Sequence, residues 1–305
     1  MKALLGVDIG TQGTKAGLFG DDGTCLAAAF RPSALHRPGP GVVEEDPERQ
    51  LDTVCAAVRE CVTKARVGAG GVAGMAIAGQ MAGVLGVGPD GRAVTPYDSW
   101  LDTRCTPYVT RMNQVAADEI VARTGGPASF NHGPKILWWM HERRRVFRGI
   151  RAFVQPAGYA AMRLCGLTAA QAFIDTSYLH FSGLADNRRR RWDPALCERF
   201  DVDARRLPRI VEPAEVVGDW PARWPGDAAC GPECRWWRVA VTPRRRSWRV
   251  APRGRESVWM WRERRRFLRP PPRSFDPTGG IGCSGLAGPR RQACGILTPT
   301  STGAG

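Results

Sequence analysis

A short turn near the N-terminus, Asp8 to Lys15, constrains the fold of this chain more than any other feature. It reads Asp-Ile-Gly-Thr-Gln-Gly-Thr-Lys and lies between two strand-like segments, residues 2–8 and 15–19. The spacing of its glycines is not that of a P-loop or of a dinucleotide-binding turn, and a strand instead of a helix follows. The chain is therefore expected to begin with two strands joined by a tight turn.

The residue types in this turn are those of a phosphate site. Its two glycines permit backbone torsions that direct successive N–H groups inward, and its two threonines can add hydroxyl donors. The aspartate that ends the first strand can hold the shell of a Mg²⁺ ion. The alternative is a plain β-hairpin whose glycines only shape the turn. The predicted phosphate and Mg²⁺ residues are Asp8, Gly10, Thr11, Gly13, Thr14 and Lys15.

Beyond the turn, the hydrophobic pattern alternates between strands and helices. Asp46-Pro47 is typical of a helix start, with a capping carboxylate before proline, and apolar residues continue at helical spacing to about Lys64. Asp193-Pro194 repeats this signal for a short helix to Phe200. Strands first, followed by alternating strands and helices, predict an α/β domain with a mixed sheet. Further strands are expected at 72–78, 83–87 and 152–155, and further helices at about 107–122, 134–145 and 156–164.

Four segments, taken together, resemble the FGGY carbohydrate kinases of the actin, Hsp70 and sugar-kinase superfamily. The turn at 8–15 is similar to the first phosphate motif of that family, and Ile77 to Met81 to its sugar-site turn. Ser99 to Arg104 resembles its tryptophan-aspartate-arginine element, and Pro134 to Trp139 its lysine-leucine-tryptophan helix. These segments occur in the family's order over residues 1–218, and the pattern is most similar to xylulokinase.

The resemblance implies an RNase H-like, sugar-side domain at 1–218, with ATP and Mg²⁺ as cofactors and a small sugar or polyol as phosphate acceptor. It implies that the sugar contacts Gln80, Met81, Trp100, Asp102 and Arg104. A flat apolar wall with a few polar groups suits a polyol. The alternative places the tryptophan in the core and makes Asp102 and Arg104 a surface ion pair. Xylulokinases have a histidine where this chain has Ala82, so the identity of the sugar stays open.

The basic charge of the chain is confined to its last part. Residues 219–305 contain 17 arginines, no lysine and six acidic residues, a net charge of +11 out of the total of +15. Seven of the eleven tryptophans also fall there. No helix or strand period is evident in this Arg/Trp/Pro-rich tail, which is expected to be disordered or poorly packed.

Three interpretations of the tail stay open. In the first, the tail is the out-of-frame translation of GC-rich codons. In the second, it is a basic aromatic tail that binds nucleic acid. It can also be a metal module built on Cys230, Cys234, Cys283 and Cys294, although their spacing is not that of a zinc knuckle. Out-of-frame translation is favoured over the nucleic-acid interpretation, because no RNA-binding fold signature accompanies the arginines. The metal module is the least favoured of the three.

The catalytic base of a sugar kinase is not identifiable in this sequence. The resemblance implies an aspartate in a glycine-rich strand-loop just after residue 218, but Asp219 and Asp227 do not follow a buried strand pattern. We therefore predict a truncated and inactive xylulokinase-like kinase, with nucleic-acid binding through the tail as the alternative. No apolar run of about 20 residues is present, and no secretory signal is evident, so a reduced, cytoplasmic protein is expected. No feature of the sequence fixes the oligomeric state.

Overall fold

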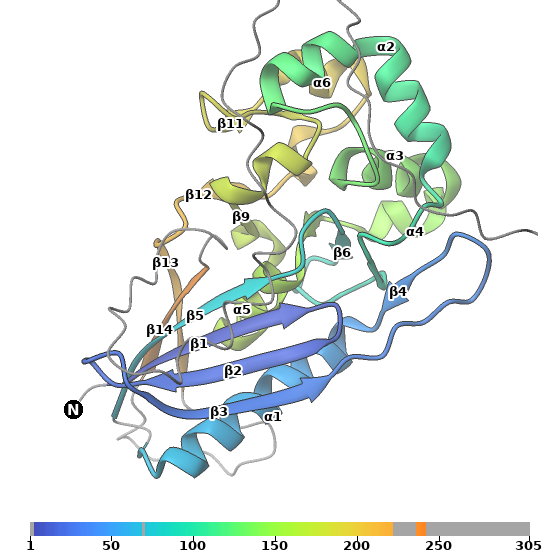
Figure 1. Cartoon of the computed structure of the whole chain (residues 1–305). Coiled ribbons are helices and arrows are strands. Elements are labelled where there is room, and N and C mark those ends of the chain that lie inside the picture. Colours follow the sequence, from blue (N-terminus) through green and yellow to red (C-terminus); the bar gives the residue numbers. More distant parts are fainter. Residues whose placement is uncertain (1–2, 69–70, 222–235, 242–305) are drawn as a thin grey trace, which may run out of the picture. The chain divides into compact units, whose positions relative to one another are not determined.

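In the computed structural model, the described residues are 3–68, 71–221 and 236–241, and their centre is a six-stranded mixed sheet (Figure 1). The strand order is β13-β14-β5-β1-β2-β3. The first three strands in sequence are antiparallel, β5 is parallel to β1, and β14 lies between β5 and β13. The bounds are β1 (Ala3–Gly10), β2 (Gly13–Phe19), β3 (Cys25–Pro32), β5 (Val72–Gly79), β13 (Val216–Pro221) and β14 (Trp236–Val241).

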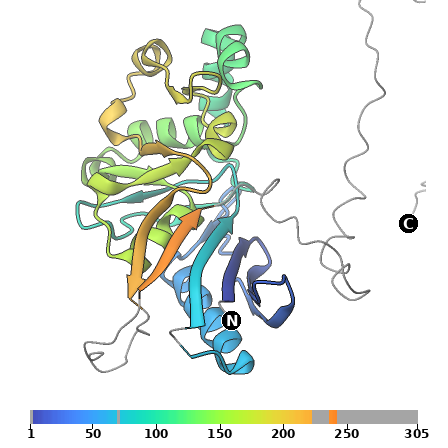
Figure 2. The same ribbon diagram turned by 90° about the vertical axis from the view of Figure 1, so that its left-hand side faces the viewer.

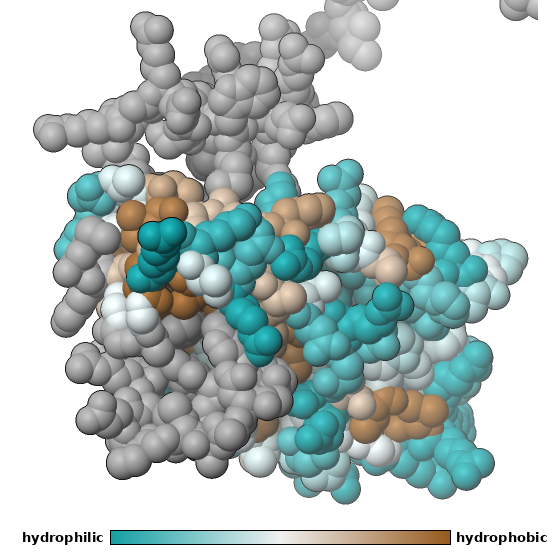
Figure 3. All heavy atoms as spheres, turned by 90° about the horizontal axis from the view of Figure 1, so that it is seen from below, coloured by the Kyte–Doolittle hydropathy of each residue, from teal (hydrophilic) through white to brown (hydrophobic). Residues whose placement is uncertain are grey.

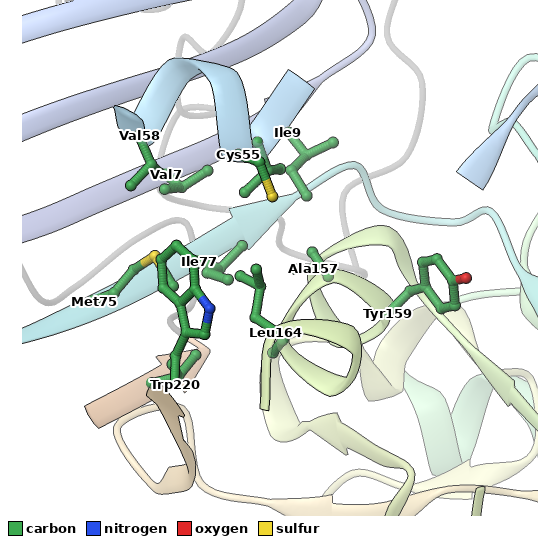
Figure 4. Close-up of a cluster of buried hydrophobic side chains, with 14 of the residues drawn as sticks. Val7, Ile9, Cys55, Val58, Met75, Ile77, Ala157, Tyr159, Leu164 and Trp220 are labelled. Carbon is green, nitrogen blue, oxygen red and sulfur yellow. The ribbon is translucent and has the colours of Figure 1, made fainter. Parts of the chain in front are cut away.

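Two helices, α1 (Pro47–Ala65) and α5 (Pro156–Cys165), cover one face of this sheet and contact each other. Alternate residues of β1 and β5 point toward them, so that Val7, Ile9 and Ile77 are buried against α1 and α5 (Figure 4). Burial of such a side chain contributes roughly 1.5–3 kcal/mol. This packing fixes which residues of β1 and β2 face the helices and which face away from them.

The helix α1 begins where the sequence predicts. The Asp46 side chain accepts hydrogen bonds from the backbone N–H groups of Glu48 and Arg49, and Pro47 occupies the first turn. A side-chain cap of this kind satisfies N–H groups that have no partner inside the helix. The predicted cap at Asp193 of α6 (Pro194–Arg199) is also confirmed. This cap fixes the residue at which α1 begins, and the helix then packs against β2 and β3.

A second group of elements packs around its own hydrophobic cluster, which includes Met112, Leu137 and Phe153. The helix predicted at 134–145 is interrupted at Arg143 and becomes α3 and α4. The helices of this group are α2 (Thr106–Thr124), α3 (His132–Glu142) and α4 (Arg144–Gly149). The described residues also form short 3-10 turns, η2 (Ala169–Gln171), η3 (Thr176–Phe181) and η4 (Ala204–Arg206).

Short two-stranded pairings complete the described part of the chain. They are β4 (Glu44–Glu45) with β7 (Tyr97–Asp98), β6 (Leu85–Val87) with β8 (Ala152–Val154), β9 (Phe173–Asp175) with β12 (Arg209–Val211), and β10 (Ala185–Asp186) with β11 (Arg191–Trp192). Seen from below, hydrophilic side chains are interspersed with several separate hydrophobic patches (Figure 3). Within the described residues, no helix is both long enough and apolar enough to cross a membrane.

The chain continues as strand beyond the boundary predicted at residue 218. The strand β13 runs through it to Pro221, and β14 pairs with both β13 and β5, as Figure 2 shows for the two orange strands beside β5. Trp220 and Val239 are buried in the same cluster as Met75. The prediction of poor packing after Gly218 is therefore wrong for these two segments. Residues 222–235 and 242–305, with the four cysteines of the proposed metal module, lie outside the described residues.

Candidate active site

The predicted turn at Asp8–Lys15 is the end of a β-hairpin. Gly10 of β1 lies opposite Gly13 of β2, and Thr11 and Gln12 form the two-residue loop. Gly13 has φ +152°, and a Cβ atom there would lie 2.2 Å from the carbonyl oxygen of Arg31. Only glycine fits such an approach. The structure therefore requires Gly13 for the packing of β2 against β3.

Asp8 and Lys15 face away from α1 and α5. They are direct partners across the hairpin, and partners in an antiparallel pair project to the same face. The Lys15 side chain is exposed. The Asp8 Oδ1 atom is buried and has no hydrogen-bond partner among the described residues. An orphaned carboxylate oxygen beside an exposed cation fits a shell of water and phosphate oxygens around Mg²⁺.

Thr14 lies on the opposite face from Asp8. Its side chain is fully buried, and its hydroxyl is 2.7 Å from the Thr53 hydroxyl of α1. The prediction that this hydroxyl serves a phosphate does not fit its position. Neighbouring residues of a strand project to opposite faces. The sequence alone therefore indicates that Thr14 and Lys15 cannot both face the phosphate.

Thr11 connects the hairpin loop to two of the predicted sugar residues. Its Oγ1 donates to Gln80 Oε1 at 3.3 Å and accepts from the indole Nε1 of Trp100 at 2.9 Å. Gln80 is buried, whereas Trp100 is 46% exposed, so the interpretation of Trp100 as a core residue is wrong. Both side chains therefore lie at the tip of the hairpin, and the indole retains a solvent-accessible surface.

The Asp102 carboxylate is buried, and two of the three guanidinium nitrogens of the mostly buried Arg104 are bonded within the protein. Asp102 is 0% exposed, and its Oδ2 accepts from the backbone N–H of Val43 and from the Arg104 guanidinium. Arg104 also pairs with Glu44 at 2.6 Å. The prediction that this pair contacts a sugar does not fit these bonds, and the alternative of a surface pair is wrong because the pair is internal. Its role is to join β4 to the segment after β7.

The charges around this pair perturb one another. Burial raises the pKa of the Asp98 carboxyl to about 7, against the lowering effect of the nearby Arg104 and Lys135 cations. Burial also lowers the pKa of the Lys135 amine, whose Nζ donates to the Asp102 carbonyl at 2.8 Å. The pKa of Arg104 is raised because its bonds to Asp102 and Glu44, together with the Asp98 charge, outweigh burial. These charged side chains therefore form one interacting, largely buried cluster in the segment around Trp100 and in α3.

Met81 and Ala82 form the backbone turn after β5. The Met81 side chain is partly buried against a small cluster that contains Tyr178 and Leu179. Ala82 has φ +66°, a left-handed conformation that residues other than glycine adopt rarely. Such strain is frequent at functional sites. The predicted sugar-site turn is thus held in a specific conformation.

Two glutamates next to the site were not selected from the sequence. Glu44 pairs with Arg104, and Glu45 is 2% exposed and accepts from Gln80 Nε2 at 2.7 Å. Burial raises the pKa of Glu45, while its bonds to Gln80 and Gln50 oppose that shift. The three consecutive acidic residues before Pro47 are the sequence signal for these glutamates, whereas the helix-start pattern accounts only for Asp46.

Neither aspartate considered as a catalytic base from the sequence is placed in this site by the described residues. Asp219 is exposed on β13, and Asp227 lies outside the described residues. Asp175, at the end of β9, caps η3 by accepting a hydrogen bond from the Ser177 N–H at 2.8 Å. Among the described residues, no group of three or more His, Cys, Asp or Glu side chains is placed to hold a metal ion. A Mg²⁺ ion at Asp8 would therefore need ligands from water and phosphate.

A sequence model for the N-terminal domain of the FGGY family of carbohydrate kinases matches residues 3–225. This chain belongs to the FGGY family of carbohydrate kinases. The match extends past residue 218 and includes all of β13. The hairpin and the turn after β5 are therefore parts of an FGGY N-terminal domain.

Curated relatives within the FGGY kinases include enzymes for two kinds of substrate. Xylulose kinase of Bacillus subtilis (strain 168) is 27% identical over 221 residues, which are 72% of this chain and 43% of that protein. Glycerol kinase of Aromatoleum aromaticum is 30% identical over 225 residues, or 72% of this chain and 45% of that protein. The chain thus spans less than half the length of these relatives.

Solved structures support the sugar-kinase fold. A xylulose kinase from Brucella ovis superposes with a TM-score of 0.68 at 24% identity, over 79% of this chain and 48% of that one. A gluconate kinase from Lactobacillus acidophilus superposes with a TM-score of 0.65 over 72% of this chain and 44% of that one. The predicted actin, Hsp70 and sugar-kinase fold is confirmed.

Proposed function

We propose that this chain forms the sugar-side part of a kinase that transfers the γ-phosphate of ATP to a hydroxyl of a ketose or polyol. The observation that supports this most directly is the position of Thr11. It is hydrogen-bonded to Gln80 and to Trp100, which are 69 and 89 positions away in the sequence. The predicted phosphate turn and two predicted sugar residues therefore form one site.

In this proposal the residues divide between phosphate and sugar. The exposed indole of Trp100 offers a flat apolar surface for the sugar, and the strained turn at Met81 and Ala82 supplies backbone polar groups beside it. Lys15 and the orphaned Asp8 carboxylate hold the phosphate side. A Mg²⁺ ion bound near Asp8 would neutralise the negative charge of the transferred phosphoryl group. Asp102 and Arg104 attach the segment that carries Trp100 to Val43 and to Glu44 of β4.

Direct sugar binding tests the proposal. We expect D-xylulose or glycerol to bind weakly in isothermal titration calorimetry, and Trp100→Ala to lower the affinity at least about tenfold because it removes the stacking surface. Val121→Ala, an exposed apolar truncation on α2, is the matched control and leaves binding unchanged. Unaltered binding by Trp100→Ala, or no binding of either ligand, contradicts the proposal.

We also propose that the 305-residue chain releases no ADP in response to sugar, because the described residues offer no placed catalytic base. Sugar-dependent ADP release in a coupled assay would show an active enzyme and would overturn this part of the proposal.

The nucleic-acid alternative depends on residues 222–235 and 242–305, outside the described part of the chain, and no contact of the described residues favours it.

A further inference from the structure

A hollow lies between the loop after β3, the strand β4 and the first turns of α1. Its volume is about 770 Å³, and residues 32–36, 44–47, 49–50 and 52–53 contribute most of its lining. The Ser33 N–H donates to the Gln12 carbonyl at 3.1 Å, so the wall formed by the loop after β3 is attached to the hairpin. A volume of this size is within the range of pockets that bind small molecules.

The lining of this pocket is acidic. Glu44, Glu45, Asp46 and Asp52 contribute four carboxylates, against the single arginine Arg49 and the imidazole of His36. Three of the carboxylates have protein partners: Glu44 has Arg104, Glu45 has Gln80 and Gln50, and Asp46 caps α1. Asp52 is exposed and forms no hydrogen bond or ion pair with a described residue. The pocket therefore has negative charge available for a cation.

Gln50 provides a second and independent indication of a ligand. Its side chain is 6% exposed, and its Nε2 donates to Glu45 Oε2 at 2.8 Å. This bond orients the amide, because the carboxylate can only accept, and leaves Gln50 Oε1 as an acceptor. That oxygen is buried and has no partner among the described residues. A buried acceptor without a partner is unfavourable, and a ligand with an N–H or O–H donor would satisfy it.

These observations restrict the chemical class of the ligand. A bare metal ion is disfavoured, because the described residues contain no group of three or more carboxylate, thiolate or imidazole ligands placed around one point. A neutral hydroxyl compound satisfies Gln50 Oε1 but gains nothing from the charge of Asp52. A primary ammonium group supplies both a positive charge and several N–H donors.

We propose that this pocket binds a small organic ammonium ion, which donates to Gln50 Oε1 and pairs with Asp52. The site is distinct from the proposed sugar site and does not depend on kinase activity. It is nevertheless connected to that site by consecutive hydrogen bonds, from Gln50 to Glu45 to Gln80 and on to Thr11, which accepts from Trp100. Ligand binding is therefore expected to change the emission of Trp100.

Calorimetry on the full chain tests this proposal with two matched probes, diaminobutane and the uncharged butanediol. We expect the diamine to bind and the diol not to bind, and Asp52→Asn to weaken diamine binding about fivefold through the loss of one charge. Asp118→Asn, which changes another exposed aspartate, on α2, is the control and leaves the affinity unchanged. Higher salt lowers the affinity of the wild-type chain.

Gln50→Leu provides a second variant, because it removes the unpaired acceptor while its shape stays similar. We expect it to lower diamine affinity further, with folding checked by thermal denaturation. Diamine addition should change the tryptophan fluorescence of the wild-type chain more than that of Trp100→Phe. This difference would show that the pocket is coupled to the hairpin through the hydrogen bonds described above. Equal binding of the diamine and the diol, full affinity in Asp52→Asn, or no diamine binding by the wild-type chain overturns the proposal.

Discussion

At the scale of single residues, Trp100 and Asp102 lie two positions apart but have opposite environments. Trp100 is 46% exposed and makes one side-chain hydrogen bond to the hairpin, whereas Asp102 is fully buried with Arg104 and the Val43 N–H. Removal of one partner from a buried ion pair leaves the other charge uncompensated. Exposed residues at a binding surface are free of this cost. Substitutions at the two positions should therefore separate binding from stability.

We predict that Asp102→Ala destabilises the fold by roughly 3–5 kcal/mol, because Arg104 stays buried without its main partner. Trp100→Ala should cost less than about 1.5 kcal/mol, since much of its surface already contacts water. Urea denaturation of both variants measures the difference. A comparable loss of stability in the two variants would show that Asp102 is not the structural member of this pair.

At the scale of secondary-structure elements, the hairpin β1–β2 depends on the absence of a side chain at Gly13. A Cβ atom there would approach the Arg31 carbonyl to 2.2 Å, whereas one at Gly10 would lie 3.3 Å from the Gly13 carbonyl. The two glycines of the predicted phosphate turn therefore differ in how well they tolerate a side chain. Gly13 is required by the contact with β3, whereas at Gly10 a small shift of the backbone would accommodate a Cβ atom.

We predict that Gly13→Ala destabilises the chain by about 3 kcal/mol or more, because β2 or β3 must shift to remove the overlap. Gly10→Ala is the matched control and should cost less than about 1.5 kcal/mol. Thermal unfolding followed by circular dichroism measures both. If the two alanine variants unfold at the same temperature, the close approach of β2 to β3 is not a constraint.

The elements that the sequence predicted well are those with local causes. Asp46 and Pro47 start α1 by contacts within a few residues, and these are visible in the sequence itself. The role of Arg104 was not predictable in the same way, because its partner Glu44 lies 60 positions earlier. Thr14 was assigned to phosphate from its residue type, although the alternation of β2 already placed it on the helix side. Residue type indicated the family, and tertiary contacts decided the role of each side chain.

At the scale of the whole described part of the chain, β14 connects two halves of the sheet. It pairs in parallel with β5 and in antiparallel with β13, so β13 has no other partner in the sheet. Its sequence, Trp-Trp-Arg-Val-Ala-Val, was missed because arginines and prolines surround it. The Val239 side chain is nevertheless completely buried in the main core.

We predict that a chain ending at residue 241 retains cooperative unfolding, whereas one ending at residue 221 loses it or aggregates. The shorter chain leaves β13 unpaired and exposes the backbone edge of β5, which favours association with other chains. Size-exclusion chromatography and urea denaturation distinguish the two outcomes. Equal stability and equal monomer content in both chains would show that β14 is dispensable for the sheet.

The position of β14 also has a consequence for synthesis on the ribosome. The strands β1, β2, β3 and β5 leave the exit tunnel early and can pair with one another as they appear. β13 emerges before the strand that separates it from β5, so it has no place in the sheet at that moment. The last two strands must therefore be added together, after translation has passed Val241. A nascent chain that stalls before this point would present the open edge of β5 to chaperones.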